Sequence, residues 1–190
     1  MKTSVNIVLH LAGLCGVAAI VHEACIGSEC EEAAFDEAAL SQQLVDAFVP
    51  YYTYEGALKV SGVVKVVGAG ILSTASQTLF WKLSDVDPKC GTPPAKDANP
   101  NACGIHIHEG MSCTESAGEH FYNKTLVSTD PWIPVKYVAA EGNGSVWSTS
   151  ARNVKVITGL SNDDMLGHTM IVHNSTGGRI ACGILNATKE

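Results

Sequence analysis

The sequence predicts an all-β domain, an antiparallel β-sandwich or barrel, that follows an N-terminal helical extension. Beyond Pro50, short runs alternate apolar and polar residues, as strands with one buried face do. Turns rich in glycine, proline and asparagine separate these runs, a pattern typical of antiparallel sandwiches. Upstream of Pro50, apolar residues recur at helical spacing instead.

The predicted strands begin at Val60. There, Val60, Val64 and Val66 alternate with Ser61 and Lys65, so the three valines share one face of a strand. Further strands are expected at residues 79–83, 104–108, 145–149, 153–158, 169–173 and 179–185.

Length and charge limit the classes of protein that fit. The chain has 190 residues, of which 46% are hydrophobic and 16% are charged, which describes one globular domain with an extension. Its formal net charge is −7, and Lys and Arg are not clustered. Nucleic acid and anionic membrane surfaces both attract clustered cations. We therefore expect neither nucleic-acid binding nor stable membrane association.

Residues 1–24 are predicted to be a secretory signal peptide. Lys2 precedes an apolar run over residues 7–21, and small residues such as Ala18 and Ala24 lie near its end. The run is shorter than the roughly 20 residues that a membrane-spanning helix prefers. We expect cleavage between Ala18 and Ala24 and a secreted, extracellular protein.

Residues 25–50 are predicted to form an acidic helical extension to a domain at residues 51–190. Leu40, Leu44, Val45 and Phe48 recur at helical spacing, and Pro50 ends the pattern. We interpret residues 29–49 as one amphipathic helix. It either packs against the domain or serves as a propeptide or docking segment.

Cysteines and glycosylation sequons favour the same compartment. Removal of Cys15 with the signal peptide leaves six cysteines, an even number that indicates disulfides but allows fifteen pairings. Sequons for N-glycosylation indicate a glycoprotein, and they begin at Asn123, Asn143, Asn174 and Asn186.

Three histidines within one short stretch predict a metal site. His106 and His108 are two residues apart in an apolar run, so both imidazoles point to one face of the expected strand. His120 follows twelve residues later, after a loop that contains glycine and cysteine. Imidazole suits copper, zinc, iron and nickel. The alternative is two strand histidines on a solvent face and an unrelated loop histidine.

The chain resembles the copper–zinc superoxide dismutase family in four motifs that occur in the family's order. They are H-x-H at residues 106–108, Gly118-Glu119-His120, G-x-T-x-x-V-H at residues 167–173 and G-x-R-x-A-C-G at residues 177–183. Together they span roughly 80 residues. Upstream, residues 58–86 match the family only as strand-like sequence.

The resemblance implies a Greek-key β-barrel whose four copper ligands map onto His106, His108, His120 and His173. It also implies a disulfide between the loop after the H-x-H strand and the final strand, which maps onto Cys113 and Cys182. For the remaining cysteines, proximity in the sequence favours the pairs Cys90–Cys103 and Cys25–Cys30.

Two departures from the family point to a copper site without zinc. No histidine lies between His120 and His168, where the family's zinc ligands are found, and only Asp130 remains as a candidate ligand. The family's charged loop is replaced by residues 174–178. Both losses resemble the extracellular copper-only superoxide dismutases, so we expect zinc to be absent.

Without zinc, another group must orient the imidazole of His120. Asp130 is the first candidate to accept its second N–H, and Glu141 is the second. Asp130 is equally well explained as part of an Asp-Pro turn. His168 is expected to be a surface histidine of its strand rather than a ligand.

The resemblance implies an oxidoreductase, an antioxidant enzyme that converts superoxide to dioxygen and hydrogen peroxide through one-electron cycling of copper. Arg179 would hold the superoxide anion beside copper, and His120 would also carry a proton. One alternative is a secreted copper-binding module without catalysis. Another is an extracellular interaction domain that docks through the predicted helix.

Overall fold

The computed structural model of the protein describes residues 22–26, 29–33, 42–92, 99–142, 145–150 and 154–188. The chain divides into two compact units, Met1–Ala39 and Leu40–Glu190. In the first unit, β1 (His22–Ile26) and β2 (Glu29–Ala33) pair antiparallel, with Cys25 opposite Cys30 in the register. Residues 1–21, which hold most of the predicted signal peptide, lie outside the described residues.

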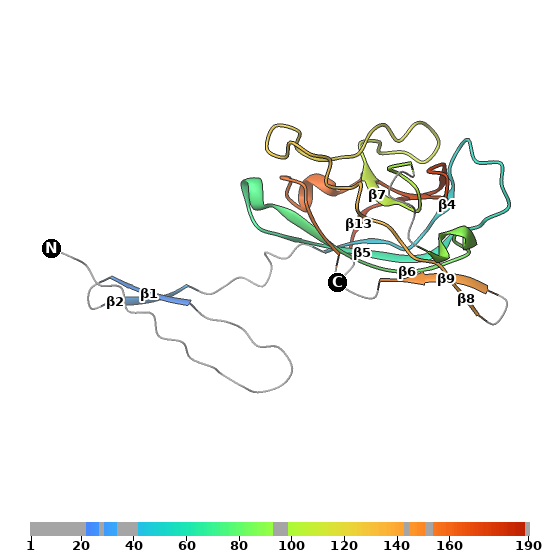
Figure 1. Ribbon diagram of the computed structural model, residues 1–190. Helices are drawn as coiled ribbons and strands as arrows, with labels where there is room; N and C mark the ends of the chain where they lie inside the picture. Colours follow the sequence, from blue (N-terminus) through green and yellow to red (C-terminus); the bar gives the residue numbers. More distant parts are fainter. Residues whose placement is uncertain are drawn as a thin grey trace. The chain divides into compact units, whose positions relative to one another are not determined.

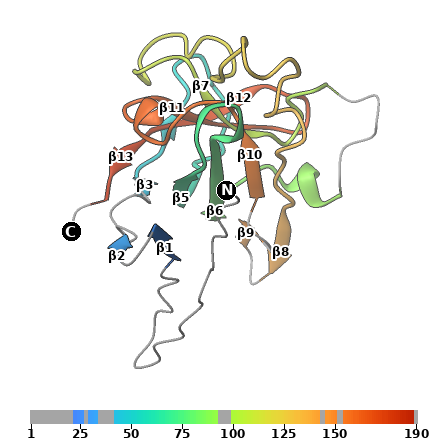
Figure 2. The same ribbon diagram turned by 90° about the vertical axis from the view of Figure 1, so that its left-hand side faces the viewer.

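The second unit contains two antiparallel sheets (Figures 1 and 2). The four-stranded sheet has the order β4 (Val49–Pro50), β12 (Arg179–Ile184), β11 (Thr169–His173) and β7 (Ile105–His108). The seven-stranded sheet has the order β13 (Asn186–Ala187), β3 (Gln42–Val45), β5 (Ser61–Ala69), β6 (Ser76–Ser84), β9 (Ser145–Thr149) and β8 (Ala140–Gly142), and β10 (Val154–Ile157) also pairs with β6. Within the described ranges, the 3₁₀ helices are η2 (Leu72–Thr74), η3 (Pro88–Gly91) and η4 (Asp163–Met165).

One hydrophobic core joins the two sheets. Leu79 and Trp81 of β6 belong to the same buried cluster as Ile105 and Ile107 of β7 and Met170 of β11. In Figure 1 the four-stranded sheet lies above the seven-stranded one. Alternation along β5 and β6 sends one set of side chains into this core, as expected for a sandwich. The prediction of an all-β, antiparallel fold is confirmed.

The strands predicted from alternation are present, with end points that differ by a few residues for β5, β6 and β10. The predicted helix over residues 29–49 is wrong for the residues that the structure describes, because this range contains β2, β3 and the start of β4. In β3, Gln43 and Val45 are buried, and Leu44 lies opposite Lys65 of β5.

The burial of Gln43 explains why the helical pattern misled. Its side-chain amide donates a hydrogen bond to the backbone carbonyl of Asn162, so a polar residue occupies a buried position. The apolar spacing from Leu40 to Phe48 is compatible with a helix when Gln43 is assumed to face solvent. Pairing of β3 with β5 and β13 decides in favour of a strand.

Among the residues that the structure describes, one disulfide joins η3 to the turn before β7, and another joins a loop to β12. Cys90 pairs with Cys103 at a Cα–Cα distance of 5.8 Å, and Cys113 pairs with Cys182 at 5.6 Å. Both are pairings that the sequence predicted. Disulfides are typical of proteins that reside in oxidising compartments.

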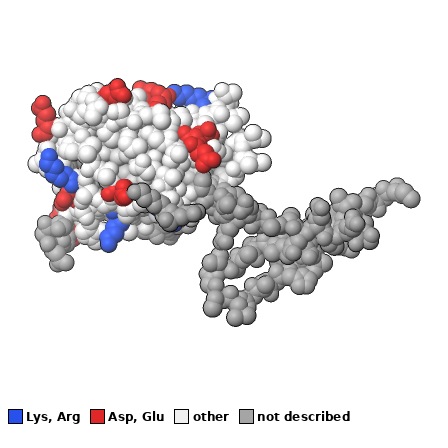
Figure 3. Space-filling model, turned by 180° about the vertical axis from the view of Figure 1, so that it is seen from behind, with Lys and Arg blue, Asp and Glu red and all other residues white. Residues whose placement is uncertain are grey.

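The surface of the second unit carries scattered charges. On the face shown in Figure 3, Asp and Glu side chains lie among larger areas of uncharged residues, and Lys and Arg side chains are separated from one another. Within the described ranges, no helix has the length and apolar character needed to cross a membrane.

Candidate metal centre

The alternation of β7 places its two histidines together. Ile105 and Ile107 enter the core, so His106 and His108 point to the opposite face of the four-stranded sheet. Despite facing away from the core, both histidines are buried. The chain then returns beside β7, where His120 forms an isolated antiparallel bridge with His108. His173 ends the neighbouring strand β11.

These elements bring four histidines into one cluster: His106, His108, His120 and His173. The ligand atoms that they offer all lie within 4.8 Å of one another. All four are buried, with exposed fractions of at most 8%. The Nε2 atoms of His108 and His173 are 3.4 Å apart. The geometry is therefore compatible with four imidazoles that bind a single ion.

Three of the rings use one nitrogen to contact a backbone carbonyl outside the cluster. The second nitrogen of each ring is then left for the interior of the cluster. The contacts are His106 Nε2 to Val135 O at 3.0 Å, His108 Nδ1 to Gly118 O at 3.1 Å and His173 Nδ1 to Gly177 O at 3.0 Å.

The fourth ring contacts a carboxylate. His120 Nδ1 lies 2.6 Å from Asp130 Oδ2, which leaves His120 Nε2 for the cluster. The other carboxylate oxygen of Asp130 accepts a hydrogen bond from the backbone N–H of Trp132 at 2.9 Å. Asp130 therefore fills both roles that the sequence suggests. One carboxylate oxygen contacts His120, and the other accepts a hydrogen bond within the turn. Glu141 is exposed on β8.

Two buried nitrogen atoms in the cluster have no hydrogen-bond partner among the described residues. They are Nδ1 of His106 and Nε2 of His120, the atoms that point away from Val135 and Asp130. A buried nitrogen without a partner is costly, and a coordinated ion would satisfy it. The orphaned atoms are therefore the observation that fits a metal ion most directly.

The environment favours neutral imidazoles. Burial, reinforced by the other histidines, holds the pKa of His106 well below its ordinary value. Burial also lowers the pKa of His108 to about 2, although its contact with Gly118 acts in the opposite direction. It lowers the pKa of His173 to about 4. At neutral pH these rings keep a lone pair on one nitrogen, as metal coordination requires.

Arg179 lies directly beside this cluster. It begins β12 and is opposite His173 in the register with β11. Its guanidinium donates hydrogen bonds from Nη2 to the carbonyl of Gly118 and from Nη1 to the hydroxyl of Tyr51, the latter at 2.8 Å. The same Nη2 atom is 3.4 Å from Nδ1 of His108. A fixed positive charge thus adjoins one of the clustered rings.

A tight turn connects His173 to Arg179. The side-chain oxygen of Asn174 accepts hydrogen bonds from the backbone N–H groups of Thr176, at 3.0 Å, and Gly178, at 2.7 Å. Because the turn is this short, the last histidine and the arginine face each other across adjacent strands.

His168 lies outside the cluster of four. Its ring is half-buried and stacks on Phe121 with a centroid distance of 3.8 Å, and its Nδ1 is 3.2 Å from the carbonyl of His108. It directly precedes β11 rather than belonging to it. It is therefore a packing residue rather than the surface strand histidine that the sequence suggested.

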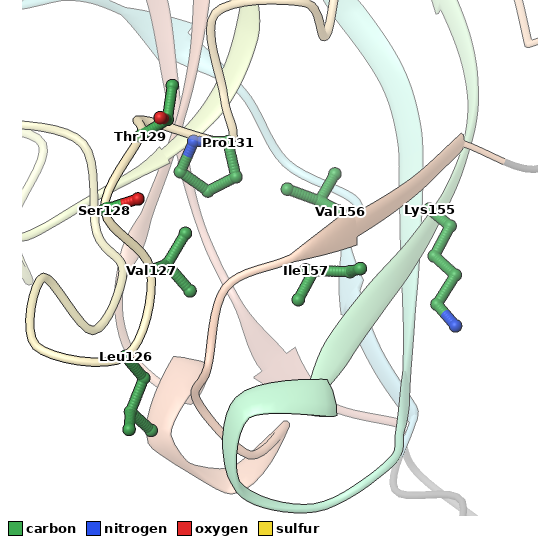
Figure 4. A pocket seen from close by; sticks show the side chains of 8 residues that line it. All are labelled: Leu126, Val127, Ser128, Thr129, Pro131, Lys155, Val156 and Ile157. Atoms are coloured by element: carbon green, nitrogen blue, oxygen red, sulfur yellow. The ribbon is translucent and has the colours of Figure 1, made fainter.

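A pocket lies between β10 and the loop that carries Asp130 (Figure 4). Thr129 and Pro131, which flank Asp130, line one side, and Val156 and Ile157 of β10 line the other. The loop that contains Asp130 therefore forms part of an open, partly apolar pocket.

The groups that hold the histidines and the arginine in place could not be recognised in the sequence. The acceptors at Val135, Gly118 and Gly177 are backbone carbonyls, which have no side-chain signature. Tyr51 has no signature in the sequence either, because nothing near it in the chain points to Arg179. Its contact with Arg179 joins residues that are 128 positions apart in the chain.

Comparison of the chain with protein-family models and with curated proteins returned no match. What the site can do is therefore inferred from its own residues. Four buried imidazoles suit a late transition metal, and an adjoining guanidinium suits a small anion.

Replacement of Asp130 by asparagine is expected to weaken metal binding. The variant keeps the size of the side chain but loses the charge that faces His120 Nδ1, so the ring is held less firmly. We expect the affinity for Cu²⁺ and Zn²⁺ to fall by about tenfold or more, measured by titration against a competing chelator. Glu141→Gln removes an exposed carboxylate and is the matched control. Equal affinities for Asp130→Asn and the unaltered protein would contradict the role of Asp130.

Proposed function

We propose that the protein is a secreted, copper-dependent superoxide dismutase. The observation that carries the proposal is the convergence of four buried imidazoles within 4.8 Å, with the guanidinium of Arg179 next to one of them. The overall reaction combines two superoxide anions and two protons to give dioxygen and hydrogen peroxide. The Greek-key connectivity implied by the family resemblance is part of the same proposal.

Copper is the metal that we propose for the cluster. Copper(II) favours tetragonal nitrogen ligation, and four imidazole nitrogens can supply it. When bound, copper supplies the one-electron chemistry by alternating between its two oxidation states. Ligation by His106 through Nδ1, and by His108, His120 and His173 through Nε2, follows from the nitrogen that each ring leaves free.

The contact between Asp130 and His120 supports our expectation that zinc is not bound next to copper. In the copper–zinc enzymes that the sequence resembles, the imidazole at this position bridges the two metals. Here Nδ1 of His120 lies 2.6 Å from a carboxylate oxygen, so that nitrogen donates a hydrogen bond and offers no lone pair to a second ion. We propose that the carboxylate takes over the orienting role of zinc.

His120 is the residue that we expect to hold and release a proton. Its Nδ1 end is fixed by Asp130, while its buried Nε2 has no partner among the described residues. A proton at Nε2 would point into the cluster, where the substrate must arrive.

Arg179 is the residue that we expect to bind superoxide. Among the described residues, two of its five N–H groups donate to Tyr51 and Gly118, which leaves others for a small anion. The formal net charge of −7 repels anions at long range, but salt screens this repulsion beyond about 8–10 Å. The local charge of Arg179 should therefore dominate the final approach.

Secretion is part of the proposal. The predicted signal peptide at residues 1–24 and the two disulfides both favour an extracellular protein. Superoxide outside the cell would then be the substrate, and glycosylation at the sequons is compatible with this route.

The first prediction of this function is superoxide consumption that depends on copper and on the cluster. We expect the copper-loaded protein to consume superoxide, measured by stopped-flow absorbance, and the metal-free protein and His106→Ala to be inactive. His168→Gln, which alters a histidine outside the cluster, is the matched control and should remain active. Tight copper binding without superoxide consumption would contradict the enzyme and favour a non-catalytic copper-binding module.

The second prediction concerns Arg179. Arg179→Ala removes the cation that adjoins His108, so the second-order rate constant for superoxide should fall by about tenfold or more and lose much of its dependence on ionic strength. Lys124→Gln removes an exposed positive charge that pairs with Glu109 and is the matched control. An unchanged rate in Arg179→Ala would show that this arginine is only structural.

A further inference from the structure

The side chain of Tyr51 is buried beside the anion-binding arginine. Tyr51 directly follows β4, and its backbone N–H donates to the carbonyl of Ile180 at 3.1 Å. Only 5% of the residue is exposed, and its ring packs in a small cluster with Ala117, Ile171 and Cys182. The cluster is separate from the main core. It lies where the N-terminal part of the domain, the loop before His120 and the strand of Arg179 meet.

The hydroxyl of Tyr51 accepts two hydrogen bonds. One comes from Nη1 of Arg179 at 2.8 Å, and the other from the backbone N–H of Ala117 at 3.2 Å. The guanidinium carbon of Arg179 also lies 5.5 Å from the centre of the tyrosine ring. Burial raises the pKa of Tyr51, but the N–H of Ala117 and the charge of Arg179 outweigh burial and lower it overall.

Tyr51 and Gly118 hold the guanidinium at two points. Tyr51 takes Nη1, and the carbonyl of Gly118 takes Nη2. Gly118 also accepts from Nδ1 of His108, so this second anchor is shared with the metal cluster. A guanidinium that is held by a single hydrogen bond can rotate about that bond. When two hydrogen bonds hold the guanidinium, its plane and its remaining N–H groups have a fixed direction.

We propose that Tyr51 is a positioning residue that aims Arg179 at the anion bound beside the metal. The hydroxyl sets the direction in which the free N–H groups of Arg179 point, and so sets the affinity of the centre for small monoanions. This role rests on the proposed function for its natural substrate, superoxide. The same hydroxyl oxygen accepts hydrogen bonds from Ala117 and Arg179. It therefore links the loop before His120 to the arginine.

Azide binding to the copper-loaded protein tests this role without an activity assay. Azide is a monoanion that coordinates copper(II) and produces a visible absorption band, so its affinity is measured by titration. Tyr51→Phe keeps the buried ring and removes only the hydroxyl, and we expect azide to bind about fivefold more weakly. Tyr52→Phe is the matched control, because Tyr52 is the adjacent tyrosine and is 50% exposed. It should leave azide affinity unchanged.

A second variant removes the same hydrogen bond from its other partner. Arg179→Ala removes the guanidinium and with it the donor to Tyr51, so it should weaken azide binding, and it tests the arginine even where Tyr51→Phe does not fold. Where both variants fold, adding Tyr51→Phe to Arg179→Ala should weaken binding no further, because the hydroxyl acts only through the arginine. Melting temperatures and copper EPR spectra establish that the fold and the metal ligands are retained.

The outcomes separate this role from the proposed function. Equal azide affinity in Tyr51→Phe and the unaltered protein, or no azide binding by either, overturns the role of Tyr51. An additional loss in the double variant overturns it as well, since Tyr51 would then act independently of Arg179. Weaker azide binding in Tyr51→Phe, in a copper protein that does not consume superoxide, supports the role of Tyr51 and contradicts only the dismutase.

Discussion

Each imidazole of the cluster is held by a hydrogen bond directed away from the cluster, and the rest of the site depends on these bonds. Three acceptors are backbone carbonyls, and the fourth is the carboxylate of Asp130. A neutral imidazole that donates from one nitrogen offers a lone pair at the other. The outward bonds therefore fix the orientation of the rings and, in the neutral form of each ring, the nitrogen that is left to bind a metal.

The acceptors lie in loops, and the fold restrains these loops in specific ways. The disulfide Cys113–Cys182 ties the loop before His120 to β12. Near the other disulfide, the N–H of Tyr137 donates to the carbonyl of Cys103, and its hydroxyl donates to the carbonyl of His173, at 2.9 Å and 2.8 Å respectively. Two strands of one sheet carry three of the histidines, while covalent and hydrogen-bonded links position the rest of the centre.

Much of this arrangement can be predicted from the sequence, because it depends on side-chain identity and strand periodicity. Alternation located β7, and the H-x-H spacing placed His106 and His108 on one face. The strand β3 could not be predicted, because the burial of Gln43 depends on a carbonyl acceptor that is 119 residues away in the chain. The backbone acceptors and the contact of Tyr51 with Arg179 likewise depend on the tertiary fold.

The most direct measurement is an EPR titration of the metal-free protein with Cu²⁺, repeated for single alanine variants of His106, His108, His120 and His173. If the four imidazoles share one ion, one equivalent of copper should give a single axial spectrum with nitrogen hyperfine structure, and each variant should alter it. Binding of more than one copper ion per chain, or a spectrum that is unchanged by loss of any one of these histidines, would contradict a shared four-histidine centre.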